Sequence, residues 1–175
     1  MSITIREANT DDIELLQQIS RQTFSEAFSA MNTAENMRRY LDESFATGKL
    51  QQELADKGAM FWVAEAAGRV VAYLKLNHGS SQTELNDPKA LEIERIYVLK
   101  EWQGKNIGQT LYKKALEIAR DLEVNYVWLG VWEDNTNAIQ FYQKNGFAAF
   151  DKHVFKLGNE EQTDIMMKLE LKQRR

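Results

Sequence analysis

A short apolar strand, a tight polar loop and an amphipathic helix follow one another between Leu91 and Leu122. The apolar side chains of the helix predicted at 107–121 recur on one face, which must pack against a sheet or another helix: Ile107, Leu111, Ala115, Ile118 and Leu122. A second apolar strand is predicted at 124–131. The chain therefore contains a strand–helix–strand unit, whose two strands should run parallel or nearly so through a right-handed crossover.

The loop of this unit reads Gln103-Gly104-Lys105-Asn106-Ile107-Gly108 and opens directly into the helix. The first turn of a helix has backbone N–H groups without internal partners, at the positive end of the helix dipole, where phosphate binds readily. Gly104 and Gly108 would let a ligand approach the backbone closely. The loop is thus a candidate pyrophosphate site, although on its own a plain strand–helix connection is the commoner explanation.

The other segments predict a mixed α/β domain that spans residues 1–175. The strands are expected at 3–8, 60–66, 70–77, 91–99, 124–131, 148–157 and 163–171. The helices are expected from a capping box at Asp11 and Glu14 to about 28, from the N-cap Thr33 over 34–57 with a break at Thr47-Gly48, at 107–121, and from Asn135 to Gly146. The hairpins among these strands predict a mostly antiparallel central sheet with flanking helices.

Composition excludes several classes of function. The net charge is −4 and the pI about 5.3, which gives no general footprint for nucleic acid. No apolar run is long enough to span a membrane and the N-terminus has no secretory pattern, so we expect a cytoplasmic protein. The absence of cysteine excludes disulfides, cysteine-ligated zinc and a cysteine nucleophile, and we expect no metal site.

Two motifs in this order resemble those of the GNAT acetyltransferases. Gln103, Asn106 and Gly108 are similar to the Q/R-x-x-G-x-G/A loop with which this family binds acyl-CoA, except that asparagine replaces the first glycine. Asparagine tolerates left-handed backbone better than other non-glycine residues, so the loop can keep its shape. The stretch Asn135–Phe147, NTNAIQFYQKNGF, resembles the family pattern N-x-x-A-[IV]-x-[FL]-Y-x-K-x-G-F.

Further stretches resemble one branch of this family, the PaiA-type spermidine/spermine N-acetyltransferases of bacteria. They are QTFSEAFSAMNTAENMRRYLDESF, LEIERIYV, VWLGVWEDN and GNEEQTDIMM. The resemblance implies direct transfer of an acetyl group from acetyl-CoA to a primary amine of spermidine, spermine or a similar small polycation in a ternary complex. The alternatives are another acceptor, such as a protein N-terminus, a Lys side chain or an antibiotic amine, and a regulatory protein that binds acyl-CoA. Monomer and homodimer both remain open.

The proposed chemistry needs a base, because an amine with a pKa near 10.4 is mostly protonated at neutral pH. Glu92 and Glu94 lie two residues apart on the strand before the loop and so share a face. They are the candidate bases, with Glu94 the first choice; a solvent-facing side of the strand is the alternative for both. Backbone N–H groups around Tyr97 and Val98 are candidates to hold the acetyl carbonyl. The resemblance implies that this strand carries a bulge and parts from its neighbour.

Tyr142 matches the family's general acid, which protonates the leaving thiolate; without the motif it would be interpreted as a core tyrosine. Asn135 matches the pantetheine contact, and Lys144 is a candidate to reach phosphate or adenine. The residues predicted to bind acetyl-CoA are Ile96, Tyr97, Val98, Gln103, Gly104, Lys105, Asn106, Ile107, Gly108, Gln109, Asn135, Tyr142 and Lys144.

Several other polar and aromatic residues have two interpretations. His78 and His153 are expected to be surface or structural residues. Trp102 and Trp132, near the two motifs, are the tryptophans expected to line a pocket. The acidic group Glu160, Glu161 and Asp164 is expected in a solvated turn, with neutralisation of a polyamine as the less favoured alternative.

Overall fold

The computed structural model describes residues 2–172. Its strands are β1 (Thr4–Glu7), β2 (Ala59–Ala66), β3 (Arg69–His78), β4 (Ala90–Val98), β5 (Tyr126–Trp132), β6 (Ala148–Leu157) and β7 (Glu160–Glu170). Its α-helices are α1 (Ile13–Phe28), α2 (Ala34–Ser44), α3 (Thr47–Ala55), α4 (Ile107–Asp121) and α5 (Thr136–Lys144). The element order is the predicted one, with the second helical region divided in two.

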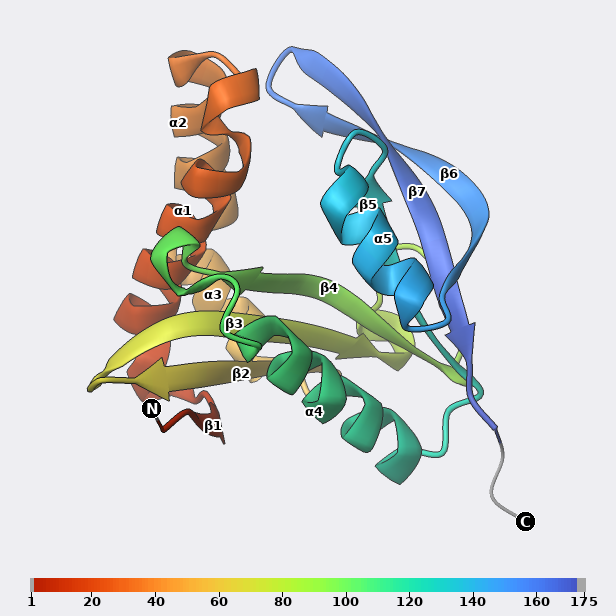
Figure 1. Cartoon of the computed structure of the whole chain (residues 1–175). Coiled ribbons are helices and arrows are strands. Elements are labelled where there is room, and N and C mark those ends of the chain that lie inside the picture. Colours follow the sequence, from red (N-terminus) through yellow and green to blue (C-terminus); the bar gives the residue numbers. More distant parts are fainter. Residues whose placement is uncertain (1, 173–175) are drawn as a thin grey trace.

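The strands form one mixed sheet in the order β1-β2-β3-β4-β5-β7-β6 (Figure 1). Every neighbouring pair is antiparallel except β4 and β5, which run parallel and are joined through α4. A mixed, mostly antiparallel sheet with flanking helices is therefore confirmed, as is the parallel strand–helix–strand unit. Short turns account for the antiparallel pairs β2–β3 and β6–β7, because such a turn can only return a strand antiparallel to the one before it. The pairs β1–β2 and β5–β7 join strands that are not consecutive in a hairpin.

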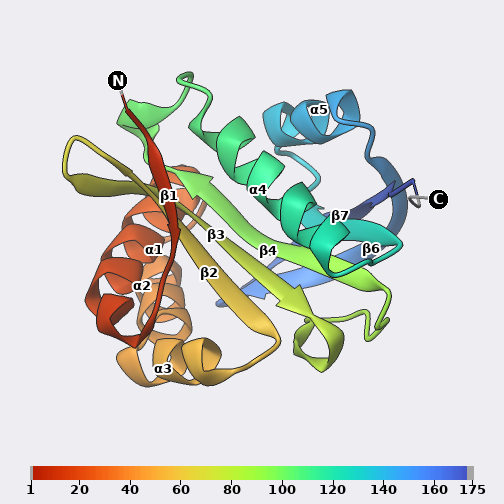
Figure 2. The same cartoon turned by 90° about the horizontal axis from the view of Figure 1, so that it is seen from below.

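Helices cover both faces of the sheet (Figure 2). The helices α1, α2 and α3 lie on one face, where α1 buries Leu16 and α3 buries Leu50. On the opposite face α4 buries Leu111 and Ala115 against β2, β3 and β4. The apolar stripe of α4 is thus the side that packs on the sheet, which leaves its N-terminal loop at the end of β4. Within residues 2–172 no helix combines the length and apolar character needed to cross a membrane.

The local signals that begin and end the helices differ in detail from the prediction. The capping box belongs to Asn9 and Asp12: the Asp11 N–H donates to Asn9 Oδ1 at 2.8 Å, and the Asn9 N–H donates to the Asp12 carboxylate at 2.9 Å. Asp12 is fixed there by an ion pair with Arg6. The break between α2 and α3 falls before Thr47, and β7 begins three residues earlier than the sequence pattern indicates.

Candidate functional site

The strands β4 and β5 pair over only three residues and then part. Ala90, Leu91 and Glu92 face Tyr126–Trp128, whereas β4 continues beside β3 to Val98 and β5 continues beside β7 to Trp132. Beyond Glu92, the edge of β4 toward β5 no longer has a partner strand. Its backbone N–H and C=O groups therefore face the opening of this fork and are available to a ligand.

A β-bulge at Glu94 lies where the strands part. In the pairing with β3, Lys75 faces Arg95 and Leu76 faces Ile93, so Glu94 is the extra residue. An extra residue reverses the alternation of side chains along the rest of the strand. As a result Glu94 and Arg95 both lie on the face covered by α1, α2 and α3. The bulge implied by the family resemblance is therefore present.

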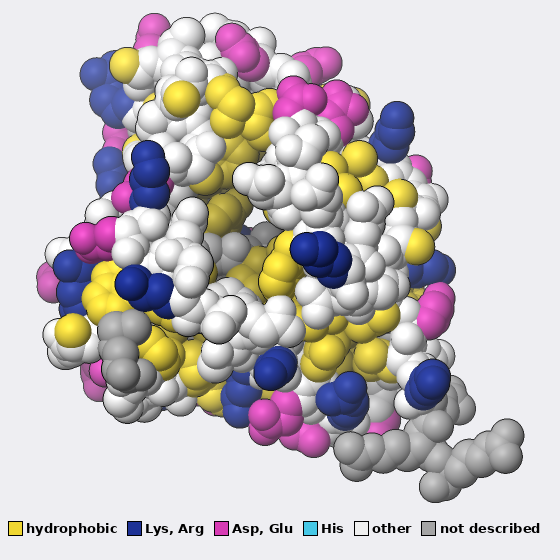
Figure 3. Space-filling view, in the orientation of Figure 1, with side chains coloured by type: hydrophobic (Ala, Val, Ile, Leu, Met, Phe, Trp, Pro, Cys, Tyr) yellow, Lys and Arg dark blue, Asp and Glu magenta, His cyan; other side chains and the backbone are white. Residues whose placement is uncertain are grey.

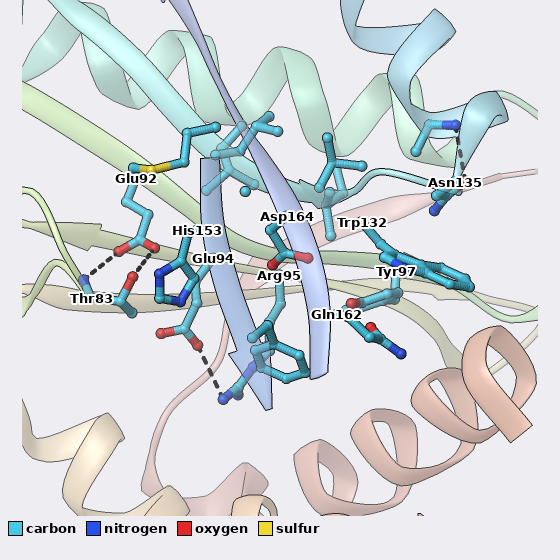
Figure 4. Close-up of a pocket in the computed structure, with 18 of the residues that line it drawn as sticks. Thr83, Glu92, Glu94, Arg95, Tyr97, Trp132, Asn135, His153, Gln162 and Asp164 are labelled. Atoms are coloured by element: carbon cyan, nitrogen blue, oxygen red, sulfur yellow. Dashed lines mark hydrogen bonds and ion pairs between the residues drawn. The ribbon is translucent and has the colours of Figure 1, made fainter. Parts of the chain in front are cut away.

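A cavity of about 500 Å³ lies on that face, over the fork. Figure 3 shows it as a hollow with hydrophobic side chains inside it. Its aromatic lining comes from α1, α2, the segment after α2, α5 and the sheet: Phe24, Phe28, Tyr40, Phe45, Tyr97, Trp128, Trp132, Tyr142 and Phe155. Its charged or titratable polar side chains are Glu84, Glu92, Glu94, Arg95, His153 and Asp164, most of them labelled in Figure 4. The cavity thus combines apolar walls with four carboxylates and one guanidinium.

Glu94 belongs to a buried network of alternating charges. Its carboxylate contacts Lys75 Nζ at 3.1 Å and Arg95 at 3.1 Å, and Glu53 of α3 contacts the same two cations at 3.2 and 3.5 Å. The Arg95 guanidinium also lies over the Phe45 ring. Burial alone would raise the pKa of Glu94, but the charges of Arg95 and Lys75 outweigh it and lower that pKa. Glu94 is therefore a poor proton acceptor at neutral pH.

Glu92 has the opposite environment. Its side chain is buried, and it accepts hydrogen bonds from Asn77 Nδ2 at 3.0 Å, from the Thr83 N–H at 2.8 Å and from Thr83 Oγ1 at 2.6 Å. Burial raises the pKa of Glu92, and these neutral donors compensate only in part. A carboxylate with a raised pKa that faces a cavity is a suitable proton acceptor.

The loop before α4 has the backbone geometry that its sequence allows. Asn106 adopts the left-handed conformation with φ 64° and ψ 17°, and Gly104 has φ 78°. The Gln103 side chain donates to the Val98 carbonyl at 3.2 Å, which fixes the loop against the end of β4. A Cβ atom at Gly104 would meet nothing within 4 Å, so the space beside the loop is open to a ligand.

Comparison with known proteins identifies the family and the fold. Residues 16–147 match the acetyltransferase (GNAT) family, which is more than half of the chain. The chain belongs to the GNAT acetyltransferase family. It is 39% identical, over 95% of its length and 96% of the relative's, to an uncharacterized N-acetyltransferase from the pepI 3′ region of Lactobacillus delbrueckii subsp. lactis. The fork, the bulge and the loop thus occur in a chain of an N-acetyltransferase family.

Two further matches concern Thermoplasma acidophilum. Its spermidine N(1)-acetyltransferase is 26% identical over 86% of this chain and 91% of that protein. The crystal structure of a PaiA N-acetyltransferase from the same organism, in complex with coenzyme A, superimposes with a TM-score of 0.81, 24% identity and coverage of 98% and 100% of the two chains. The resemblance to PaiA-type proteins thus holds in sequence and in fold, and the GNAT fold supports acetyl-CoA binding.

The residues predicted to bind acetyl-CoA in this GNAT protein divide into two groups. Ile96, Tyr97, Asn135 and Tyr142 line the cavity at the fork. Val98, at the end of β4, and the residues of the loop and the first turn of α4, Gln103–Gln109, lie beyond the cavity. Ile107 buries its side chain in the core, so only its backbone can contact a ligand.

Asn135 and Lys144 mark the two ends of α5. The Asn135 Oδ1 atom accepts the Ala138 N–H at 3.2 Å and so caps the helix, which leaves the Nδ2 amide as the group for a pantetheine contact. Lys144 is exposed in the last turn of α5. Tyr142 lies between them in the sequence. Its ring centroid is 5.5 Å from that of Phe147 and 5.4 Å from that of Phe141. Burial raises the pKa of Tyr142, so its hydroxyl keeps its proton at neutral pH.

The structure brings in residues that the sequence did not single out. Thr83 and Asn77, which hold Glu92, come from the loop before β4 and from β3. His153 is not isolated: its Nδ1 contacts the Glu84 carboxylate at 2.5 Å across the cavity wall. No local signal indicates these pairs, because their partners are distant in the sequence.

Among the tryptophans, Trp132 lines the cavity as predicted, whereas Trp102 packs against the core outside it.

Proposed function

We propose that residues 1–175 act as a single cytoplasmic domain that transfers acetyl from acetyl-CoA to a primary amine of spermidine, spermine or a similar polyamine, directly in a ternary complex. The observation that carries the acceptor class is the charge of the cavity. Four carboxylates line it, and within residues 2–172 only Glu94 among them is paired with a Lys or an Arg side chain. A polycation compensates this excess of negative charge. The similarity to a spermidine N(1)-acetyltransferase supports the same acceptor.

In this proposal acetyl-CoA binds at the fork from the side of α4 and α5. The left-handed Asn106 and the open space at Gly104 suit a pyrophosphate at the N-terminus of α4. The uncovered edge of β4, with the N–H groups near Tyr97 and Val98, suits the pantetheine arm and the acetyl carbonyl. The acyl group would then reach the fork from one face of the sheet and the amine from the other.

In the proposed reaction the amine nitrogen bonds to the acetyl carbon and the carbon–sulfur bond breaks. Glu92 takes the proton that the amine must lose, directly or through water, and Tyr142 gives a proton to the leaving sulfur. Glu94, the first choice as base from the sequence, is paired with Lys75 and Arg95 and has a positioning role here. Direct transfer also suits a chain without cysteine to carry an acyl intermediate.

The test is release of free CoA thiol from acetyl-CoA with a panel of amines. Spermidine, spermine, putrescine, a Lys-containing peptide, a peptide with a free N-terminus and an aminoglycoside cover the competing acceptors. We expect turnover with the polyamines and little with the others. Turnover only with another amine would contradict the proposed polyamine acceptor but agree with N-acetyl transfer. Binding of acetyl-CoA without turnover of any amine would favour a regulatory protein.

A further inference from the structure

Three of the four carboxylates that line the cavity have a hydrogen-bond or ion-pair partner among residues 2–172. Glu94 is paired with Lys75 and Arg95, and Glu84 accepts the His153 Nδ1. Glu92 is held by neutral donors and is the proposed base. The fourth carboxylate, that of Asp164, has no hydrogen bond or ion pair within residues 2–172.

Asp164 lies on the opposite side of β5 from Glu92. In the sheet it faces Trp132 of β5 and His153 of β6, and its side chain points into the cavity (Figure 4). Its Oδ2 atom lies over Gly130: a Cβ added there would be 3.6 Å away. Burial raises the pKa of this carboxyl, and neighbouring His153 offsets the effect only in part. A half-buried carboxylate without a partner from the described residues can pair with a cationic group of a ligand.

The surroundings of Asp164 suit a cationic group in particular. Trp132 stands beside it in the sheet register and also lines the cavity. An indole face attracts an ammonium group, and the attraction grows when water is excluded. His153, the nearest group that can carry positive charge, donates its Nδ1 to Glu84 instead. The side of the cavity at Asp164 and Trp132 is thus open to an ammonium that comes from outside the chain.

We propose that Asp164, with Trp132, binds a second ammonium group of the acceptor and makes the enzyme selective for diamines and longer polyamines over monoamines. This inference rests on the proposed function and adds a specificity-determining residue to it. Glu92 faces Trp128 and Asp164 faces Trp132, four residues apart on β5 or about 13 Å along the strand. An acceptor that reaches both carboxylates therefore needs a chain of several carbon atoms between its two nitrogens.

The experiment compares kcat/KM for amine pairs of equal chain length, 1,7-diaminoheptane with heptylamine and 1,8-diaminooctane with octylamine, in the wild-type enzyme and in Asp164→Asn. A hydrogen-bonded charge contributes about 1.5–3 kcal/mol, so the substitution should lower the diamine preference by about 10-fold to 100-fold. The kcat/KM for the monoamines should stay within about 2-fold. Asparagine has the size of aspartate, so the shape of the site is retained.

Glu161→Gln is the matched control, because Glu161 lies on the same strand but is exposed, faces Lys156 and is outside the cavity. It should leave the diamine preference unchanged. Gly130→Ala is a second variant: its Cβ meets Asp164 at an ordinary contact distance and narrows the ammonium position without strain, so it should also lower the preference.

Three results would overturn the inference. One is an unchanged diamine preference in Asp164→Asn, and another is an equal loss for monoamines and diamines. The third is a wild-type enzyme that acetylates both kinds of amine equally well, which would leave the proposed reaction intact. A wild-type enzyme that acetylates no amine would instead refute the proposed function itself, and this inference with it.

Discussion

Replacement of Glu92 by glutamine tests whether Glu92 or Glu94 is the base. Glu92 Oε1 accepts from Asn77 Nδ2 and the Thr83 N–H, while Oε2 accepts from Thr83 Oγ1. Glutamine retains Oε1 as an acceptor. Its Nε2 amide can donate to Thr83 Oγ1 once the Thr83 hydroxyl hydrogen has rotated away. The fold should therefore keep its hydrogen bonds, and the free energy of unfolding should change by no more than about 1 kcal/mol.

The effect on catalysis should be much larger. A positioned base contributes roughly 10²-fold to 10⁴-fold, or about 2.7–5.5 kcal/mol of transition-state stabilisation. Because the Glu92 side chain is only 3% exposed, bulk water cannot easily replace it, and we expect kcat/KM for spermidine to fall by about 10³-fold. Release of CoA thiol measures this rate, and urea denaturation checks the stability.

The pH dependence gives a second, independent readout. The pKa of Glu92 is raised by burial, so wild-type kcat/KM should fall as the pH drops through a value above the ordinary 4.3 of glutamate. Glu92→Gln should lack this acidic limb. Glu94→Gln should retain it, because the pKa of Glu94 is lowered by Arg95 and Lys75. Loss of the limb in Glu94→Gln, with less than about 10-fold loss of rate in Glu92→Gln, would refute the assignment of Glu92 as base.

Three further substitutions test the rest of the site. Tyr142→Phe should lower kcat by about 10²-fold or more and leave the Kd for acetyl-CoA, measured by calorimetry, within about 2-fold; an unchanged kcat would exclude the acid role. Asn106→Ala should lose about 1 kcal/mol of stability in urea because of its positive φ, whereas Asn106→Gly should not; equal stability of the two would contradict a strained backbone. Lys75→Met should lose about 3 kcal/mol, because Glu53 and Glu94 are left with one cation; a stability equal to that of the wild type would show that the network is not needed.

Sequence patterns predicted the fold because its elements depend on local periodicity. The apolar stripe of α4 and the alternation in the hairpins are written within single segments, and both are found in the structure. The capping box was placed two residues too late, because Asp12 is fixed by Arg6 from β1 and Asn9 then serves as the cap. Such a pairing of side chains from different elements leaves little trace in a local pattern.

The sequence by itself determined the acyl-CoA side of this protein. The loop from Gln103 to Gly108 and the motif from Asn135 to Phe147 are each contiguous, because the phosphate and pantetheine contacts that we propose lie at the ends of single elements. Only the tertiary structure decided the acceptor side. Glu92 and Glu94 share a face in the sequence pattern. The charges of Lys75 on β3 and of Arg95, next to the bulge, lower the pKa of Glu94, while burial raises that of Glu92. Asp164 likewise enters the cavity only because β7 pairs with β5, since charge compensation depends on which side chains the fold brings within a few ångströms.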